Sequence, residues 1–222
     1  MSYKATLGII LLIVLIVAAV GAYLVFSGPK KAVVGVHAGD TFTYKLTGTV
    51  TLQAIDATIT PGFEVYNQTD YYKVAITAVN GTIVTINNDW HFLNGTSVTD
   101  TQTLDISNGL SSITNGFWAI YSSGLNVGDL IRPTGHDGII VNQTDTKTYP
   151  DGGRTRCFWS IENQFFDIND PTQSTLRYDY TAVYFDQKTG ILETLNNITY
   201  YNNPLKTEAI TWQLISTSLW NV

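Results

Sequence analysis

The chain has 222 residues, of which 44% are hydrophobic and only 14% are charged, and its net charge is −6. This composition excludes a disordered polyelectrolyte, and the scarcity of Lys and Arg argues against nucleic-acid binding, which requires clustered cations. The single cysteine excludes an intramolecular disulfide framework and the usual thiolate zinc site.

The N-terminal region contains a membrane-spanning pattern. Residues 7–26 have no charged side chain, and about twenty helical residues cross a hydrocarbon core of roughly 30 Å. The sequence therefore predicts a short tail at 1–6, a transmembrane helix at 7–26 and a linker at 27–35. A signal peptide cleaved before Tyr23 is the alternative, because small residues precede that position. No cysteine follows the apolar run, which excludes a bacterial-type lipoprotein anchor.

The rest of the chain is expected outside the cytoplasm, held at the cell membrane by this single span. Lysines flank the span on both sides, at Lys4 and at Lys30-Lys31, so they do not determine the orientation. The prediction rests on the acidic, Thr- and Asn-rich composition and on N-x-T sequons, of which about three would arise by chance. The candidate glycosylation sites are Asn67, Asn80, Asn94, Asn142 and Asn197.

Residues 36–222 are predicted to form one mainly β domain, either an antiparallel sandwich or a curved half-barrel sheet. Apolar and polar residues alternate over 42–52 and again over 72–78, which is the period of a strand with one buried face. Asn80-Gly81 and Asn94-Gly95 each separate two such runs, and this pattern predicts β-hairpins.

The C-terminal half continues the β pattern. Residues 178–185 are apolar on both faces, which predicts a central strand, and a loop at 186–190 leads into a strand at 191–201. A last strand at 210–214 closes the domain. Only residues 110–123 fit a helix, and a short one.

Two turns share a pattern in which Gly-Asp follows an apolar position. They are Gly39-Asp40, within residues 36–42, and Gly128-Asp129, within residues 125–131. Glycine supplies a permissive backbone, and the aspartate side chain can accept hydrogen bonds from the backbone of its own turn. The pattern predicts either an internal structural echo or a generic turn that occurs twice.

Four segments carry a resemblance to a known group of proteins. They lie at residues 36–44, 124–129, 151–154 and 184–192. By their order and spacing, the chain resembles archaeal membrane-anchored, extracytoplasmic β-rich proteins of uncharacterised function. The resemblance covers nearly all of the part beyond the membrane span, and it implies no catalytic residue.

Two shorter resemblances point to other functions. The Thr189-Gly190 hairpin after a Tyr-rich strand resembles the curved-sheet lipoprotein carriers of the LolA type, which implies an apolar pocket. Lys4-Ala5 before the apolar run is similar to the N terminus of archaeal type IV pilins, which implies cleavage after Ala5 and assembly into a filament. Thr6 as the first mature residue and the helix-stopping Gly28-Pro29 depart from the pilin pattern.

No motif predicts catalysis, a metal site or a cofactor, so the chain is predicted not to be an enzyme. His136-Asp137 is the nearest approach to an oriented base, yet no nucleophile motif accompanies it. Asp167 and Asp170 lie in a loop without the central Gly and terminal Glu of a calcium site. Cys157 is predicted to be a buried, inert thiol, and His91 a packed or surface residue.

Aromatic residues are numerous, with 13 Tyr, 9 Phe and 5 Trp. Packing between strands accounts for many of them, and the remainder suit a concave cleft for apolar groups or sugars. The candidate cleft residues are Phe117, Trp118, Tyr121, Trp159, Phe165 and Phe166.

These features together predict a membrane-anchored extracytoplasmic β domain with a non-enzymatic binding or surface-display role. A surface glycan, a lipid or a protein is its expected partner. One alternative is a carrier or sensor that holds a lipid or another apolar ligand in the pocket of a curved sheet. The other is a pilin-like filament subunit. A solidly packed sandwich core would exclude the carrier.

Overall fold

A computed structural model describes residues 16–17, 30–114, 116–166 and 176–222. The chain divides into two compact units, 1–30 and 31–222. Among the described residues, no helix combines the length and the apolar character needed to cross a bilayer. The predicted transmembrane helix lies outside these residues except for Ile16 and Val17, and so does the candidate calcium loop.

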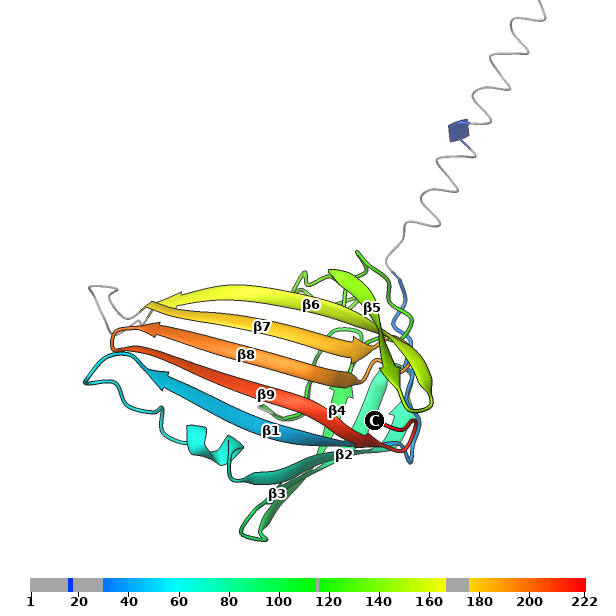
Figure 1. Cartoon of the computed structure of the whole chain (residues 1–222). Coiled ribbons are helices and arrows are strands. Elements are labelled where there is room, and N and C mark those ends of the chain that lie inside the picture. Colours follow the sequence, from blue (N-terminus) through cyan, green and yellow to red (C-terminus); the bar gives the residue numbers. More distant parts are fainter. Residues whose placement is uncertain (1–15, 18–29, 115, 167–175) are drawn as a thin grey trace, which may run out of the picture. The chain divides into compact units, whose positions relative to one another are not determined.

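The second unit is a single antiparallel β-sheet (Figure 1). Its strand order is β4-β3-β2-β1-β9-β8-β7-β6-β5, and a short 3-10 helix, η1 (Phe63–Tyr66), follows β1. The predicted mainly β, antiparallel fold is confirmed. The strands are β1 (Thr41–Leu52), β2 (Thr69–Asn80), β3 (Ile83–Phe92), β4 (Ser97–Asp105), β5 (Gln143–Tyr149), β6 (Gly152–Phe166), β7 (Leu176–Asp186), β8 (Leu192–Asn202) and β9 (Leu205–Thr217).

The sheet consists of two meanders, β1–β4 and β5–β9, which the pairing of β1 with β9 joins. It is not closed, because β4 and β5 form its two edges. Figure 1 shows that it is strongly curved. Register shifts interrupt the ladders at Thr43/Tyr44 in β1, Ile76/Ala78 in β2 and Tyr184/Phe185 in β7, and such bulges increase the local twist of a sheet.

The predicted hairpins are present. The Asn80-Gly81 turn connects β2 to β3, and the Asn94-Gly95 turn connects β3 to β4. Both glycines have a positive φ, 61° and 82°, which this residue adopts without steric cost. The strand predicted to be central is β7, and it pairs with a neighbour on both sides. The strand in the middle of the sheet is β9, which the sequence predicted only as the last strand of the domain.

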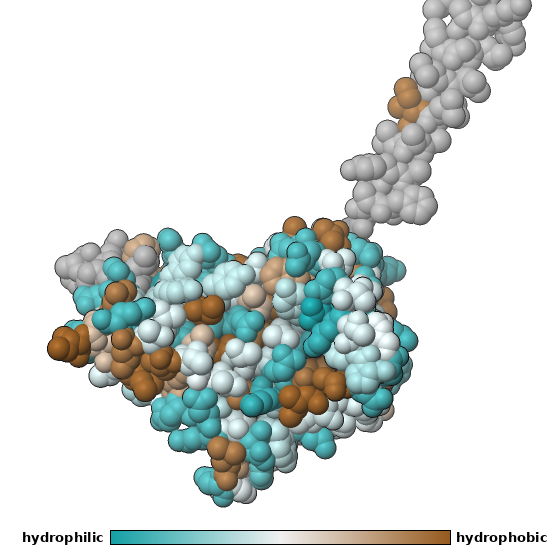
Figure 2. All heavy atoms as spheres, in the orientation of Figure 1, coloured by the Kyte–Doolittle hydropathy of each residue, from teal (hydrophilic) through white to brown (hydrophobic). Residues whose placement is uncertain are grey.

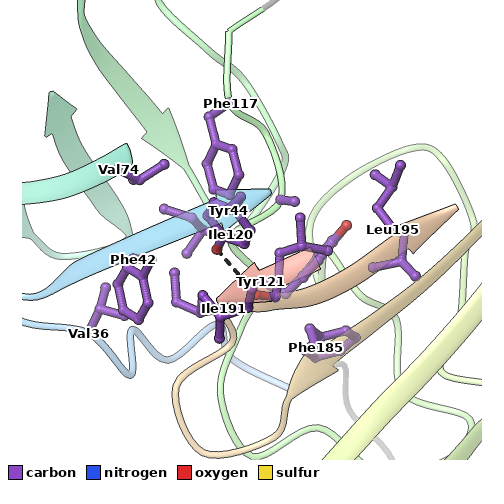
Figure 3. Packing of buried hydrophobic residues seen from close by; sticks show 14 of the residues in the cluster. Val36, Phe42, Tyr44, Val74, Phe117, Ile120, Tyr121, Phe185, Ile191 and Leu195 are labelled. Carbon is purple, nitrogen blue, oxygen red and sulfur yellow. Dashed lines mark hydrogen bonds between the residues drawn. The ribbon is translucent and has the colours of Figure 1, made fainter. Parts of the chain in front are cut away.

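The predicted short helix at 110–123 is wrong. The described residues of this range form turns, bends and isolated bridges, including Ile120 with Ile191. They belong to the long connection 106–142 between β4 and β5, which packs against the face toward which the sheet curves, here called the inner face. Phe117, Ile120 and Tyr121 from this connection are buried in the core, and Figure 3 shows them beside Tyr44. The connection therefore takes the place that a second layer would occupy.

The two Gly-Asp turns have the same local structure. Asp40 Oδ2 accepts a hydrogen bond from the backbone N–H of His37, and Asp129 Oδ2 accepts one from that of Asn126, both at 2.7 Å. The preceding glycines have φ values of 99° and 88°, in the region that disfavours other residues. The first turn begins β1, whereas the second leads only to an isolated bridge. The similarity is therefore limited to the two turns and does not extend to the structure that follows them.

Candidate ligand-binding groove

A groove of about 880 Å³ lies on the inner face of the sheet. Its walls come from β2, β3 and β4 on one side and from β7, β8 and β9 on the other, so the curvature of the sheet forms it. The wall is completed by residues of the long connection, which are Ser111, Ile113, Thr114 and residues 116–119. Concave sites of this size, mostly apolar with a few polar groups, are typical of small-molecule binding.

The groove is lined by five aromatic rings in mutual contact, which we call the groove aromatic cluster. Tyr72 lies at its centre, with ring centroids 4.9 Å from Trp212, 5.9 Å from Trp90 and 6.2 Å from Phe117. The Tyr66 ring lies 6.4 Å from that of Trp90. Centroid separations of this kind are those of favourable aromatic pairs. The members are Tyr66, Tyr72, Trp90, Phe117 and Trp212.

Hydrogen bonds behind the cluster fix two of its rings. The Trp90 indole N–H donates to Thr69 Oγ1 at 2.7 Å, which orients the ring. Tyr66 ends η1, and Asn67 attaches this helix to β1 by exchanging two hydrogen bonds with the backbone of Gly48. A side chain at Gly48 would meet the Phe63 ring at 2.8 Å, so the close approach of η1 to the sheet depends on this glycine.

A chain of polar side chains lies beside the aromatic cluster, on β3 and β4. Asn88 Nδ2 donates to Asp100 Oδ1 at 2.7 Å and to Gln102 Oε1 at 3.0 Å. Gln102 Nε2 donates in turn to Ser111 Oγ and to the Phe117 carbonyl, both at 2.8 Å. This chain joins the edge of the sheet to the connection over the groove. Asp100 and Ser111 also line the groove.

The structure separates the six predicted cleft residues into three groups. Phe117 and Trp118 line the groove. Tyr121 and Trp159 are buried in the core, with rings 6.4 Å and 6.2 Å from that of Trp118. Phe165 and Phe166 are exposed at the end of β6 and are not part of the groove lining.

Sequence reasoning missed Tyr66, Tyr72, Trp90 and Trp212 as groove residues. Trp90 and Trp212 each occupy an alternating position of a predicted strand. The alternation indicates that each lies on a buried face, but it does not indicate which residues of other strands that face will meet. The missing information was the curvature, which brings β2 and β3 opposite β8 and β9. No local sequence signal reports that curvature.

The candidate glycosylation sites differ in their surroundings. Asn80 and Asn94 are exposed in hairpin turns, and Asn142 is exposed just before β5. The Nδ2 atoms of Asn67 and Asn197, in contrast, donate hydrogen bonds to Gly48 O and Thr181 Oγ1. A glycan on either of these two would replace a hydrogen atom at a nitrogen that the fold uses.

The residues considered for catalysis do not form a site. His136 is exposed, and Asp137 forms an ion pair with Arg132 at 3.2 Å. Cys157 is buried, as predicted, and donates to the Leu125 carbonyl. Within the part of the chain that the structure describes, no group of three His, Cys, Asp or Glu residues is placed to hold a metal ion.

A second polar cluster, the Glu193 cluster, surrounds a fully buried carboxylate. Tyr149 donates to Glu193 Oε2 at 2.6 Å, and Arg156 and Lys147 approach the same oxygen at 3.7 Å and 4.0 Å. Arg156 also forms a bidentate pair with Asp145 at 2.8 Å and 2.7 Å. Burial raises the pKa of Glu193, and the hydrogen bond from Tyr149 and the two cations offset this only in part.

The surface seen in Figure 2 carries apolar residues in several small groups separated by polar ones. Scattered groups of this kind are ordinary for a protein surface and do not identify a binding site. The sequence matches no known family model, and no curated protein is significantly similar to it. The assignment of a function therefore depends on the groove itself.

Proposed function

We propose that this protein is a non-enzymatic binding protein that holds an apolar ligand in the groove on the inner face of its sheet. The observation that carries the proposal is the groove of about 880 Å³ lined by the aromatic cluster. A ligand that covers Tyr66, Trp90 and Trp212, each only partly buried, gains roughly 25 cal/mol for every Å² of apolar surface removed from water.

The groove favours the carrier or sensor over a role in surface display alone. Display requires no internal cavity, whereas a carrier requires one, such as the groove left between the sheet and the long connection. The resemblance of the Thr189-Gly190 hairpin to LolA-type carriers points the same way. We retain the proposal of an N-terminal membrane anchor and an extracytoplasmic domain, which rests on the apolar run at 7–26 and on the composition.

A neutral apolar fluorescent probe, N-phenyl-1-naphthylamine, tests the groove directly. We expect saturable binding to the wild type and, for Trp212→Ala, an affinity lower by about fivefold, because a stacking ring is lost. Tyr200→Ala is the matched control, since this aromatic residue of β8 is exposed and lies outside the groove lining. No saturable binding to the wild type, or equal losses in both variants, would overturn the proposal.

The N-terminal sequence and intact mass of the protein from its native membrane test the anchor. A terminus at or near Met1 supports a permanent span. A terminus at Thr6 supports the pilin-like filament subunit, and a terminus at Tyr23 supports a secreted domain. Either of the two cleaved forms would overturn the anchored arrangement, while the groove proposal stands or falls on the probe.

A further inference from the structure

The groove combines aromatic faces with a carboxylate. Asp100 lies on β4, and its register partner on β3 is Asn88, so Trp90 is its diagonal neighbour across the ladder. Tyr72 on β2, the register partner of Trp90, is affected by the same charge: burial first, and then the Asp100 carboxylate, raise the pKa of its hydroxyl. The charge of Asp100 is therefore adjacent to the groove aromatic cluster.

No cation of the described chain occupies this position. Among the described residues that line the groove, none is Lys, Arg or His, and no ion pair between described residues includes Asp100. None of the cation–π contacts of the described residues involves a ring of the groove aromatic cluster, and only the one at Trp118 involves a residue that lines the groove. They place Arg132 over Trp118, Lys147 over Tyr149, Arg154 over Trp220, Arg156 over Tyr184, and Arg177 and Lys206 over Tyr201.

The polar chain behind Asp100 fixes the position of its carboxylate. The Phe117 carbonyl can only accept, so it fixes Gln102 with Nε2 toward it and Oε1 toward Asn88. Asn88 must then direct Nδ2 at Gln102 and Asp100, and its buried Oδ1 has no partner among the described residues. Asn88 is only 2% exposed, so the Asp100 carboxylate is held from behind by a fixed donor. Neither Asn88 nor Gln102 is among the residues that line the groove, so the charge that a ligand meets there is that of the Asp100 carboxylate, which favours a positively charged group.

We propose that the ligand is an organic ammonium ion, an apolar chain or ring system that carries a positively charged amine or quaternary ammonium group. This inference rests on the proposed function of the groove and specifies its ligand class. Aromatic faces attract such cations through their quadrupoles, and a neighbouring carboxylate adds direct charge attraction. An anionic head group would instead meet Asp100 with no cation of the described lining to offset the repulsion.

A matched series with one apolar chain and three head groups tests the inference. Octyltrimethylammonium, 1-octanol and octanoate are titrated into the whole protein at neutral pH, with tryptophan fluorescence and calorimetry as readouts. We expect the ammonium to bind about tenfold more tightly than octanoate, with octanol between them. Tetramethylammonium, which lacks the chain, is expected to bind weakly at the same site and to compete with the octyl ligand.

Asp100→Asn tests the source of the preference, and Asp56→Asn is its control. The asparagine in the first variant keeps the shape and the hydrogen bond from Asn88 but loses the charge, so affinity for the ammonium should fall about fivefold while octanol binding is unchanged. Asp56 is exposed and outside the groove, so its variant should bind as the wild type does. If the affinity for the ammonium falls in Asp100→Asn but not in Asp56→Asn, the loss is not a general response to the change in net charge.

Val98→Arg provides a second test that does not remove any native contact of Asp100. Val98 is 56% exposed on the edge strand β4 and shares a face with Asp100, so an arginine there can pair with the carboxylate. The ammonium preference should disappear in this variant and persist in Val79→Arg, whose site lies outside the groove lining. Equal binding of all three octyl ligands to the wild type would overturn the inference. So would an unchanged preference for the ammonium ligand in both Asp100→Asn and Val98→Arg. Absence of any octyl binding would overturn the proposed function instead.

Discussion

The buried carboxylate of the Glu193 cluster and the Asp100 carboxylate of the groove have opposite surroundings. Glu193 is fully buried and has two cations within 4.0 Å, together with the Tyr149 hydroxyl. Asp100 is partly buried beside aromatic rings, and its hydrogen bond within the described residues comes from the neutral amide of Asn88. The difference indicates that groups of the fold offset part of the cost of the first charge, whereas the second is available to a ligand.

The energetics of the two sites explain this division. Removing a charge from water costs several kcal/mol, and only close opposite charges and hydrogen bonds offset that cost. Arg156 interacts with two carboxylates in this way, because one Nη atom approaches Glu193 while Nε and the other Nη bind Asp145. At Asp100 the remaining exposure to solvent avoids most of this cost, so no internal cation is required.

The largest effect is expected from Arg156→Gln. This change leaves Glu193 buried with only Lys147 opposite it and also breaks the bidentate pair with Asp145. We expect the free energy of unfolding to fall by about 3–5 kcal/mol, the range for removal of one partner from a buried ion pair. Urea denaturation at neutral pH measures it.

The control for this prediction is Arg177→Gln. The side chain of Arg177 is 50% exposed, and its ion pair with Asp179 is open to solvent, so the expected loss is below about 1 kcal/mol. Equal losses in the two variants would show that the Glu193 cluster is no more important to the fold than a surface pair.

A smaller loss is expected from Gln102→Leu, which interrupts the polar chain at the groove. Leucine leaves the Phe117 carbonyl and one bond of the Asn88 amide without their partner, and each buried unsatisfied group costs roughly 1–3 kcal/mol. Because the chain also holds the connection over the groove, affinity for the octyl ligands should fall as well. A loss of affinity at unchanged stability would contradict the shared role of Gln102.

Local sequence patterns predicted most of the strands, though not β5 and β6, and they did not predict how far the sheet curves. Asn80-Gly81 and Asn94-Gly95 identified two hairpins because their turns require residues that tolerate a positive φ. The pairing of β1 with β9 and the position of β9 in the middle of the sheet could not be predicted, since no short-range signal connects residues so far apart. The error at 110–123 has a similar cause, because its apolar residues pack on the sheet and not along one helical stripe.

The residues of the groove were predicted only in part, because no local sequence signal reports the curvature of the sheet. Phe117 and Trp118 were candidates because the chain has more aromatic residues than packing between strands accounts for, and they line the groove. Tyr121 and Trp159 share that signal, yet they pack within the core beside them. Asp100 has no sequence signal at all, since an aspartate at an alternating position of an edge strand resembles an ordinary solvent-facing residue.

The pH dependence of Glu193→Gln tests the raised pKa of the buried carboxylate. The folded-state pKa of Glu193 lies above its ordinary value of 4.5, so between these two values the folded protein binds more protons than the unfolded chain. The contribution of Glu193 to stability therefore falls as the pH rises through this window. The glutamine variant lacks this loss and can keep the hydrogen bond from Tyr149, so it should gain stability relative to the wild type as the pH rises above 4.5. Parallel pH profiles of unfolding free energy would contradict the raised pKa.

The smallest effect on stability is expected from Asp100→Asn, the variant that most affects ligand binding. Asparagine can accept the hydrogen bond from Asn88 through its own Oδ1, and no ion pair between described residues is lost. The free energy of unfolding should change by less than about 0.5 kcal/mol, as for surface substitutions away from special features. A loss near that of Arg156→Gln would instead assign Asp100 to the fold, because a carboxylate that stabilises the empty domain so strongly is not held available for a cationic ligand. Urea denaturation of both variants under one set of conditions therefore tests whether the two carboxylates have different roles.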